Sequence, residues 1–228
     1  MSEKKYVIIA AGGYGTRMQS EVPKQFLLLG GVPVIVHAIQ IFNKIWDDAQ
    51  FIVVLPEDQL VRWEKINKKF LRKKNIRATC GGATRFHSVR NGLKFVKDEG
   101  IIAVQDACRP LTSEQLLTKC LDEVIDKKVV IPVIDLKDSI REIIKDGSRN
   151  RNRAKYKAVQ TPQCFYASIL KNAYRQTFVE SFTDDASVVE AAGYRVHMVE
   201  GEPDNFKITT PYDMMLAEII LHKQQTAS

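Results

Sequence analysis

Short apolar runs rich in β-branched residues alternate with stretches of helical periodicity along the first 130 residues. The apolar runs, each expected to form a strand, lie at residues 6–11, 51–55, 77–80, 101–105 and 129–133. Apolar residues recur at helical spacing near residues 34–45, 57–74, 84–97 and 113–126. This alternation predicts an α/β fold with a mostly parallel sheet and helices on both faces. The strands are apolar almost throughout, as expected for strands buried on both faces.

Residues 135–157 interrupt this alternation. The segment is strongly charged and carries the pair Asp146-Gly147 between two stretches that could be extended, which indicates a β-hairpin. Its apolar residues are too few to bury it in the main core, so we expect a projecting arm. A lone hairpin is marginally stable in water, and a second subunit is the natural surface for it to pack on.

The remainder of the chain returns to mixed periodicity. We expect helices near 166–179 and 185–192, strands near 195–199 and 206–209, and a last helix from Pro211 with Thr210 as its N-cap. Ser187 and Glu190 have the spacing of a capping box. The length of 228 residues fits one domain, 1–228, that includes the arm.

The first predicted strand ends in the glycine-rich segment AAGGYGTRM, residues 10–18. Exposed backbone N–H groups beside a helix start attract anions, and the cations Arg17 and Lys24 flank the glycines, so the segment indicates a phosphate site. The dinucleotide fingerprint does not fit, because its third small residue would fall on Met18. The P-loop does not fit either, because the chain contains no Gly-Lys pair. A tight strand-to-helix turn with two surface cations is the alternative.

Polar segments also follow other predicted strands, and because parallel strands end at a common edge, we expect these segments to converge on one cleft. In QDACRP, Asp106 follows a strand and Arg109 comes three residues later. One carboxylate can hold Mg²⁺ when substrate phosphates supply the other ligands, while a helix-capping Asp with an ion-paired Arg is the alternative.

Two further segments supply polar groups to the same edge. GGATRFHS offers the backbone of Gly82, the guanidinium of Arg85 and the hydroxyl of Ser88, either for a base edge or as a helix N-cap without a ligand. DNFKITTPYD places Lys207 in an otherwise apolar predicted strand. A phosphate-rich site with one metal carboxylate suits phosphoryl or nucleotidyl transfer, in which positioning and charge neutralisation supply most of the catalysis.

Composition narrows the alternatives. Hydrophobic residues make up 45% of the chain and no apolar run is long enough to cross a membrane. The four cysteines and four histidines show no metal-ligand spacing, so we expect free thiols, a reducing cytoplasm and no zinc site. The formal charge of +7 suits phosphorylated substrates and also nucleic acid. Much of the excess lies in residues 64–77, whose apolar residues keep helical spacing, which favours a solvated helix face.

Seven motifs, in order along nearly the whole chain, make it resemble the 2-C-methyl-D-erythritol 4-phosphate cytidylyltransferase family. They are AAGGYGTRM…PKQF, GGATRFHSVRNGL, QDACRP, DLKDSI, QTPQCF, FTDDASVVEAAG and NFKITTPYD. The resemblance implies a Rossmann-like nucleotidyltransferase fold and a homodimer built through the arm. It also implies attack of a methylerythritol phosphate oxygen on the α-phosphorus of CTP, with release of pyrophosphate. The ribitol-5-phosphate cytidylyltransferases share most of these motifs and are the alternative, but TDDAS and the AAG start favour the methylerythritol enzyme.

The resemblance also assigns residues to roles. The catalytic cations would be Arg17, Lys24 and Lys207. CTP would be bound by Ala11, Gly12, Gly13, Gly15, Gly82, Arg85, Ser88 and Ala107. The sugar-alcohol phosphate would be bound by Asp106, Arg109, Ser139, Arg153, Thr161 and Thr183, with Asp106 near Mg²⁺ and Arg153 acting across the dimer. Three residues depart from the usual pattern of the family, namely His87, Gln105 and Cys108, and none is a phosphate-binding cation. Neither nucleic acid nor a membrane is an expected partner.

Overall fold

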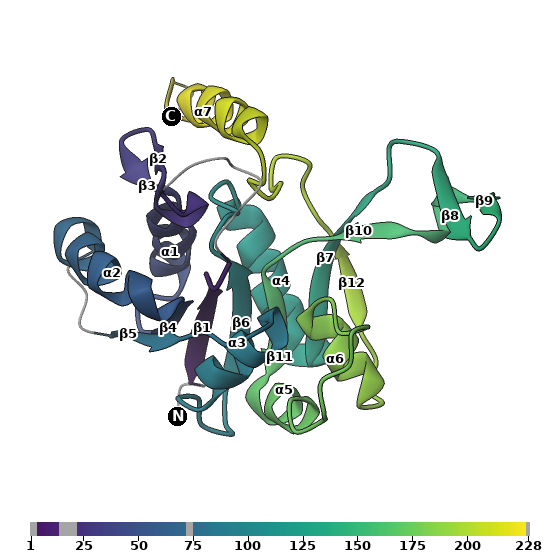
Figure 1. The fold of residues 1–228 in the computed structure, drawn as a ribbon. Helices are drawn as coiled ribbons and strands as arrows, with labels where there is room; N and C mark the ends of the chain where they lie inside the picture. Colours follow the sequence, from purple (N-terminus) through teal and green to yellow (C-terminus); the bar gives the residue numbers. More distant parts are fainter. Residues whose placement is uncertain (1–3, 14–21, 72–74, 227–228) are drawn as a thin grey trace.

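The computed structural model of the chain describes residues 4–13, 22–71 and 75–226 (Figure 1). Within these ranges eight strands form the main sheet: β1 Lys5–Ala10, β4 Gln50–Leu55, β5 Ile76–Cys80, β6 Ile101–Asp106, β7 Val129–Asp135, β10 Lys157–Val159, β11 Gln163–Tyr166 and β12 His197–Glu200. The α-helices are α1 Val34–Ile45, α2 Leu60–Ile66, α3 Arg85–Leu93, α4 Glu114–Lys127, α5 Ala167–Ala173, α6 Asp185–Ala191 and α7 Pro211–Thr226. The short elements are β2 Leu28–Leu29, β3 Val32–Pro33, β8 Ile140–Ile144, β9 Gly147–Arg151, η2 Lys24–Phe26, η3 Glu57–Gln59, η4 Asn67–Leu71 and η5 Arg153–Lys155.

The main sheet is mostly parallel, as predicted. Its strand order is β10-β7-β11-β6-β1-β4-β5, and β12 also pairs with β7. Strands β6, β1, β4 and β5 run parallel to one another, and β12 runs parallel to β7. The sequence did not predict β11, which lies antiparallel between β6 and β7. Its four residues, Gln163–Tyr166, are too few for a period of two to be recognised, and they directly precede a helix.

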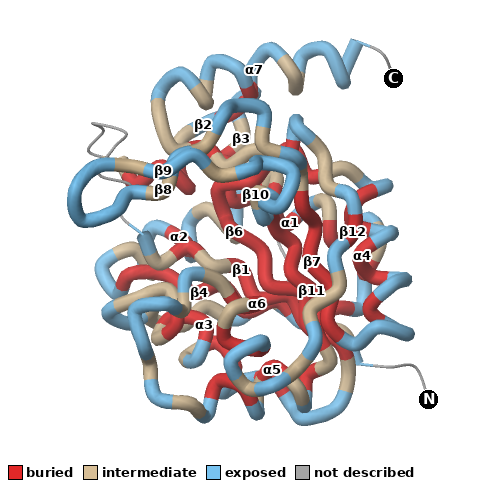
Figure 2. The backbone as a smooth tube through the Cα atoms, turned by 90° about the vertical axis from the view of Figure 1, so that its right-hand side faces the viewer, coloured by how far each residue is buried: buried red, intermediate tan, exposed pale blue. Residues whose placement is uncertain are grey.

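Side chains of β1 alternate between two hydrophobic layers. Val7 and Ile9 pack in the layer formed with α1, α2 and α4, whereas Tyr6 and Ile8 pack in the layer formed with α3, α5 and α6. Figure 2 shows the buried residues concentrated in the strands between these helices. The continuous apolar run is therefore explained by a strand whose two faces are both covered, and the prediction of helices on both faces is confirmed.

Two predicted elements differ from the structure in a way that has a physical cause. Residues 206–209 form no strand. Phe206 and Ile208 alternate with Lys207 because they pack in a cluster with α7, and the Ile208 N–H donates one hydrogen bond, of 2.8 Å, to the Cys108 carbonyl. The helix expected near 166–179 ends at Ala173, where the chain turns and the side chain of Gln176 donates to carbonyls of both α5 and α6.

The helix starts agree with the polar signals in the sequence, with one correction. Thr210 accepts a hydrogen bond of 3.2 Å from the Asp213 N–H, so it caps α7 as predicted. The capping box of α6 is formed by Asp184 and Ser187, not by Ser187 and Glu190. Asp184 holds the cap position because its carboxylate accepts from the Ser187 N–H at 2.8 Å.

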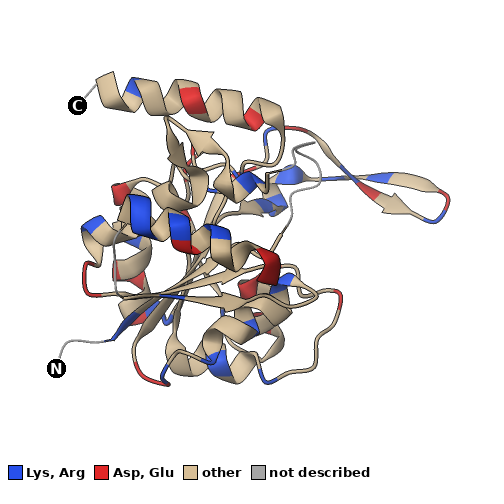
Figure 3. Cartoon of the chain, turned by 60° about the vertical axis from the view of Figure 1, so that its left-hand side comes forward, with Lys and Arg blue, Asp and Glu red and all other residues tan. Residues whose placement is uncertain are grey.

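The hairpin predicted for residues 135–157 is present as β8 and β9, which project from the body of the molecule (Figures 1 and 3). Ile144 pairs with Gly147, and the φ of Gly147 is +130°, a conformation that favours glycine. The antiparallel ladder joins β8 and β9, and Glu142 on β8 also forms exposed ion pairs with Arg149 and Arg151 on β9.

The cysteines and the basic segment have the environments that the composition predicts. All four cysteines are free thiols, as expected. In the basic segment, Ile66, Phe70 and Leu71 pack against the core while Lys68 and Lys69 lie outside it, which confirms a solvated helix face over its described part. No helix within the described ranges is long and apolar enough to cross a membrane.

Gly100, directly before β6, lies in close contact with Lys4, directly before β1. Its φ is +106°, and a Cβ there would collide with the Lys4 carbonyl, which also accepts from the Ile101 N–H. Gly193 has a φ of +86° with open space around it, so Gly193→Ala is the matched control. We expect Gly193→Ala to lower Tm by about 2–4 °C through backbone strain and Gly100→Ala to lower it at least twice as far. Equal shifts in thermal unfolding experiments would contradict the steric argument.

Candidate active site

The carboxyl ends of β1 and β6 meet at two adjoining cavities, of about 260 and 280 Å³. Both are lined by Ala10, Gly13, Asp106 and Lys207. Neighbouring parallel strands bring two of these residues together, because Ala10 at the end of β1 pairs in register with Asp106 at the end of β6. Gly13 follows β1, and Lys207 comes from the segment before α7. The expected convergence of strand-end segments on one cleft is therefore confirmed for the described residues.

Two lysines bring positive charge to the first cavity. Lys24, in η2, is buried, and its Nζ donates to the Ile208 carbonyl at 2.9 Å. Lys207 lies one residue before Ile208 and forms an ion pair of 2.9 Å with Asp106. The segment that carries Lys207 thus also supports Lys24, which keeps two ammonium groups on one cavity wall.

Asp106 is the buried anion shared by the two cavities. Lys207 lies at 2.9 Å from its carboxylate, Arg109 at 3.6 Å and Arg85 at 3.7 Å. Burial alone would raise the pKa of Asp106, but the positive charges of Lys207, Arg85 and Arg109 outweigh burial and lower this pKa to about 2. Asp106 does not cap a helix, so ion pairing and not capping explains its position.

Arg109 and Thr161 support Asp106 from outside the lining of the two cavities. The Thr161 hydroxyl accepts from the Asp106 N–H at 3.1 Å. The Arg109 guanidinium donates to the Asn205 carbonyl at 2.6 Å, and the Asn205 amide donates to the Thr161 carbonyl at 2.9 Å. Desolvation lowers the pKa of Arg109 despite its pairing with Asp106. These bonds tie the segment after β6 to the segment before α7.

The second cavity is built on the start of α3. Thr84 is the N-cap of this helix, and the Ser88 hydroxyl accepts from the Gly82 N–H at 3.0 Å. A Cβ at Gly82 would lie 2.5 Å from the His87 Cβ, so glycine allows the backbone to approach the helix closely. GGATRFHS is therefore both a capped helix start and part of a cavity wall.

The structure brings most of the predicted site residues together and separates others. Lining one or both cavities are Ala11, Gly12, Gly13, Lys24, Gly82, Arg85, Ser88, Asp106, Ala107 and Lys207. Ser139 and Arg153 belong to the arm, and Thr183 lies before α6, so these three do not line the cavities. Gly15 and Arg17 lie outside the described residues.

The described lining residues that the sequence did not predict are Ala10, Gln25, Ala83, Thr84, Cys108 and Thr209. Gln25 is buried and donates to the Ala11 carbonyl at 3.0 Å, which fixes the segment after β1. Its position directly after Lys24 in PKQF is a signal that could have found it. Cys108 departs from the usual pattern of the family, and burial raises the pKa of its thiol to about 11.

The donor set restricts the kind of metal that the site can hold. Within the described ranges, no group of three or more His, Cys, Asp and Glu side chains could hold a metal ion. Asp106 is the carboxylate in the lining of both cavities. One carboxylate fits Mg²⁺, which retains water and takes further oxygens from substrate phosphates, and does not fit a metal that needs a full set of protein ligands.

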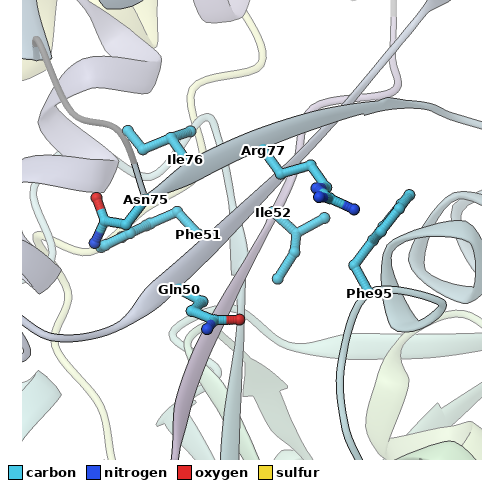
Figure 4. Close-up of a pocket in the computed structure, with 7 residues that line it drawn as sticks. All are labelled: Gln50, Phe51, Ile52, Asn75, Ile76, Arg77 and Phe95. Atoms are coloured by element: carbon cyan, nitrogen blue, oxygen red, sulfur yellow. The ribbon is translucent and has the colours of Figure 1, made fainter.

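A separate cavity of about 590 Å³ lies at the amino ends of β4 and β5 (Figure 4). On one side of this cavity, the guanidinium of Arg77 lies 4.7 Å from the centre of the Phe95 ring. None of the predicted site residues within the described ranges lines this cavity. It lies at the opposite end of the strands from Asp106, so it does not belong to the candidate active site.

Comparison with known proteins finds one family along nearly the whole chain. A family model described as 2-C-methyl-D-erythritol 4-phosphate cytidylyltransferase matches residues 5–223. The protein of that name from Phocaeicola vulgatus is 43% identical over 217 residues, which cover 95% of this chain and 99% of the relative. The one from Bacteroides fragilis is 44% identical over 214 residues, with coverage of 94% and 98%.

Solved structures with the same kind of description have the same fold. A 4-diphosphocytidyl-2C-methyl-D-erythritol synthase from Anaerococcus prevotii superposes with a TM-score of 0.82 and 28% identity, covering 96% of this chain and 99% of its own. A 2-C-methyl-D-erythritol 4-phosphate cytidylyltransferase from Thermus thermophilus gives a TM-score of 0.76 and 30% identity, with coverage of 97% and 100%.

The lowered pKa of Asp106 predicts a pH-dependent stability. Because this pKa is lower in the folded chain than in the unfolded chain, the ionised carboxylate stabilises the fold above about pH 4 and loses this effect as the pH falls towards 2. In metal-free buffer, acidification from about pH 5 to pH 2 should cost wild type about 2 kcal/mol more unfolding free energy than Asp106→Asn. Urea unfolding measures this difference, and Asp122→Asn on the exposed face of α4 is the control. A variant that follows the wild-type pH curve would contradict the assignment.

Proposed function

This chain belongs to the 2-C-methyl-D-erythritol 4-phosphate cytidylyltransferase family, and we propose that its two adjoining cavities bind the substrates of that reaction. The reaction joins CTP and 2-C-methyl-D-erythritol 4-phosphate to give 4-diphosphocytidyl-2-C-methyl-D-erythritol and pyrophosphate. The observation that carries the proposal is the meeting of Lys24, Lys207 and Asp106 beside the backbone of Ala11 and Gly13. A triphosphate needs this combination of concentrated positive charge and close backbone approach.

The cavity at the start of α3 suits the nucleoside of CTP. Gly82 and Ser88 supply a backbone edge and a hydroxyl there, and Arg85 adds a fixed guanidinium. Gly13 lines this cavity and also the one with the lysines, so the phosphates of a bound nucleotide would lie along the segment after β1. This placement follows the rule that ligands of open α/β sheets bind outside the carboxyl ends of the strands.

In the chemical step, a phosphate oxygen of the sugar-alcohol phosphate attacks the α-phosphorus of CTP in line. The new P–O bond forms as the bond to the bridging oxygen of the β-phosphate breaks, and pyrophosphate leaves with the electron pair. Negative charge on the α-phosphate oxygens would be stabilised by Lys24 and Lys207, with Arg17 as a further cation by family resemblance. The Lys207 side chain is 40% exposed, which leaves it room to move from Asp106 to a phosphate.

Asp106 would hold Mg²⁺ together with substrate phosphate oxygens and water. When bound, the ion supplies further neutralisation of phosphate charge.

We also place the enzyme in the cytoplasm, because its thiols are free and a reducing compartment maintains that state.

The arm is proposed to join two copies of the chain. Ile143 and Ile144 are 82% and 43% exposed on a hairpin whose second strand is polar, which supports contact with another surface. Arg153 follows β9 in η5, and its guanidinium donates to the Lys137 carbonyl at the base of the arm. In a dimer, this arginine would reach the sugar phosphate in the site of the other subunit.

The first test measures pyrophosphate release from CTP and Mg²⁺ with a panel of acceptor phosphates. We expect 2-C-methyl-D-erythritol 4-phosphate to be the preferred acceptor over ribitol 5-phosphate.

Lys24→Ala should lower kcat by about 10²–10³-fold and weaken CTP binding much less, because the positive charge of Lys24 matters most as negative charge develops on the α-phosphate. Lys44→Ala, at an exposed ion pair on α1, is the control. No release with any erythritol or pentitol phosphate would overturn the function, and a raised KM at unchanged kcat would overturn the role of Lys24.

The second test asks whether Arg153 acts in trans. Arg153→Ala and Lys24→Ala subunits are each expected to be nearly inactive alone. After subunit exchange, half of the dimers are mixed, and each mixed dimer has one site with an intact lysine and an intact arm. Activity should therefore recover to about one quarter of wild type. If Arg153 served the site of its own subunit, every site would contain a defect and mixing would restore nothing.

A further inference from the structure

One guanidinium, that of Arg85, lies between two carboxylates at unequal distances. Its Nη2 donates to the Asp185 Oδ2 at 2.6 Å, whereas its Nε lies 3.7 Å from the Asp106 Oδ1. The side chain of Asp185 is completely buried, and that of Arg85 is 26% exposed and lines the cavity at the start of α3. The close partner of Arg85 is therefore the buried carboxylate outside the cavity lining, not the carboxylate in the cavity.

Asp185 is itself held by a second hydrogen bond. The Tyr174 hydroxyl donates to the Asp185 Oδ1 at 2.6 Å, so each carboxylate oxygen has one short partner. The Tyr174 ring stacks on Phe86, the residue after Arg85, with 4.7 Å between ring centres. Arg85, Asp185, Tyr174 and Phe86 thus form a closed ring of contacts, since Arg85 and Phe86 are neighbours in the chain. The ring joins the first turn of α3 to the end of α5 and the start of α6.

The backbone around Asp185 is anchored to the sheet. The Gln163 amide of β11 donates to Asp184 at 2.8 Å, and its carbonyl oxygen accepts from the Ala186 N–H at 2.9 Å. Asp185 begins α6, where the helix dipole favours a negative charge. The Asp185 carboxylate that binds Arg85 therefore lies at a helix start whose flanking residues, Asp184 and Ala186, are hydrogen-bonded to Gln163.

The distances indicate what this anchoring does. Guanidinium and carboxylate groups match in geometry for a bidentate pair, yet the nearest contact between Arg85 and Asp106 is the single long one of 3.7 Å. Asp185 keeps Arg85 beyond hydrogen-bond distance of Asp106, and Lys207 forms the short ion pair with Asp106 at 2.9 Å instead. The contacts of Asp185 therefore keep the Arg85 guanidinium at the longer ion-pair distance from Asp106 and fix its place in the cavity wall.

We propose that Asp185, held by Tyr174, is a positioning residue that fixes the Arg85 guanidinium in the wall of the nucleotide cavity. The proposal rests on the proposed function, since it takes CTP as the nucleotide. Without the Asp185 charge, Arg85 moves onto Asp106, and the cavity loses a preorganised donor for CTP. The effect falls on nucleotide binding and not on the affinity for the sugar-alcohol phosphate.

The test measures the Kd of CTP by calorimetry, and Tm, for the full-length protein. Asp185→Asn should raise the Kd of CTP about tenfold or more, as expected for a lost bond between charged partners. Tyr174→Phe should give a smaller rise, because the carboxylate remains. Asp184→Asn is the matched control, since Asn also caps helices well and Asp184 bonds to Ser187 and Gln163 instead of Arg85. An unchanged Kd in a folded Asp185→Asn protein would overturn the proposal.

A double-mutant cycle separates positioning from a purely structural role. Arg85→Gln leaves Asp185 buried without its cation, so it should lower Tm, and Asp185→Asn in that background should restore part of it. The Kd of CTP should stay at the Arg85→Gln value in the double variant, because Asp185 acts through Arg85. A further rise in Kd would overturn the proposal. A wild-type protein that binds CTP and releases no pyrophosphate would contradict the proposed function alone, because the Kd comparison does not depend on turnover.

Discussion

A buried carboxylate at the end of β6 has to be neutralised, and the organisation of the site follows from that requirement. Asp106 is buried, and a buried charge without partners is too costly for a folded chain to carry. Its partners come from three segments: Arg85 from α3, Arg109 from the turn after β6, and Lys207 from the segment before α7. One anion thus gathers parts of the chain that are otherwise separated by whole helices and strands.

The same requirement makes the cavities positive. The described residues that line them include the cations Lys24, Arg85 and Lys207, and one carboxylate, Asp106. The partners that neutralise Asp106 therefore leave an excess of positive charge beside a glycine backbone. Such an excess is unfavourable in an empty cavity and favourable when a triphosphate occupies it, so the electrostatics of the fold and those of substrate binding are parts of one arrangement.

The sequence predicted features that leave a local signal. The paired strands β1 and β6 are largely apolar runs, and Lys24 and Asp106 each lie in a recognisable motif, PKQF and QDACRP. Features set by tertiary packing were missed or misassigned. Phe206 and Ile208 alternate like strand residues although they pack under α7 without a strand ladder, and β11 is too short to show its period. Arg85 and Asp185 are 100 positions apart in the sequence, so the residues around each of them carry no local signal of their pairing.

The two kinds of cation in the site differ in how firmly they are held, and this difference matters for catalysis. Arg85 and Arg109 donate to fixed acceptors, Asp185 and the Asn205 carbonyl, so their guanidinium groups are preorganised before substrate arrives. Lys207 is tied to Asp106 by one ion pair on a flexible stem and is partly exposed. The rigid guanidinium of Arg85 in the cavity wall suits the recognition of a bound nucleotide, which needs a constant shape, whereas that of Arg109 keeps Asp106 in place from outside the cavities. A lysine that can exchange a carboxylate for a phosphate suits a reaction in which charge moves between phosphate groups.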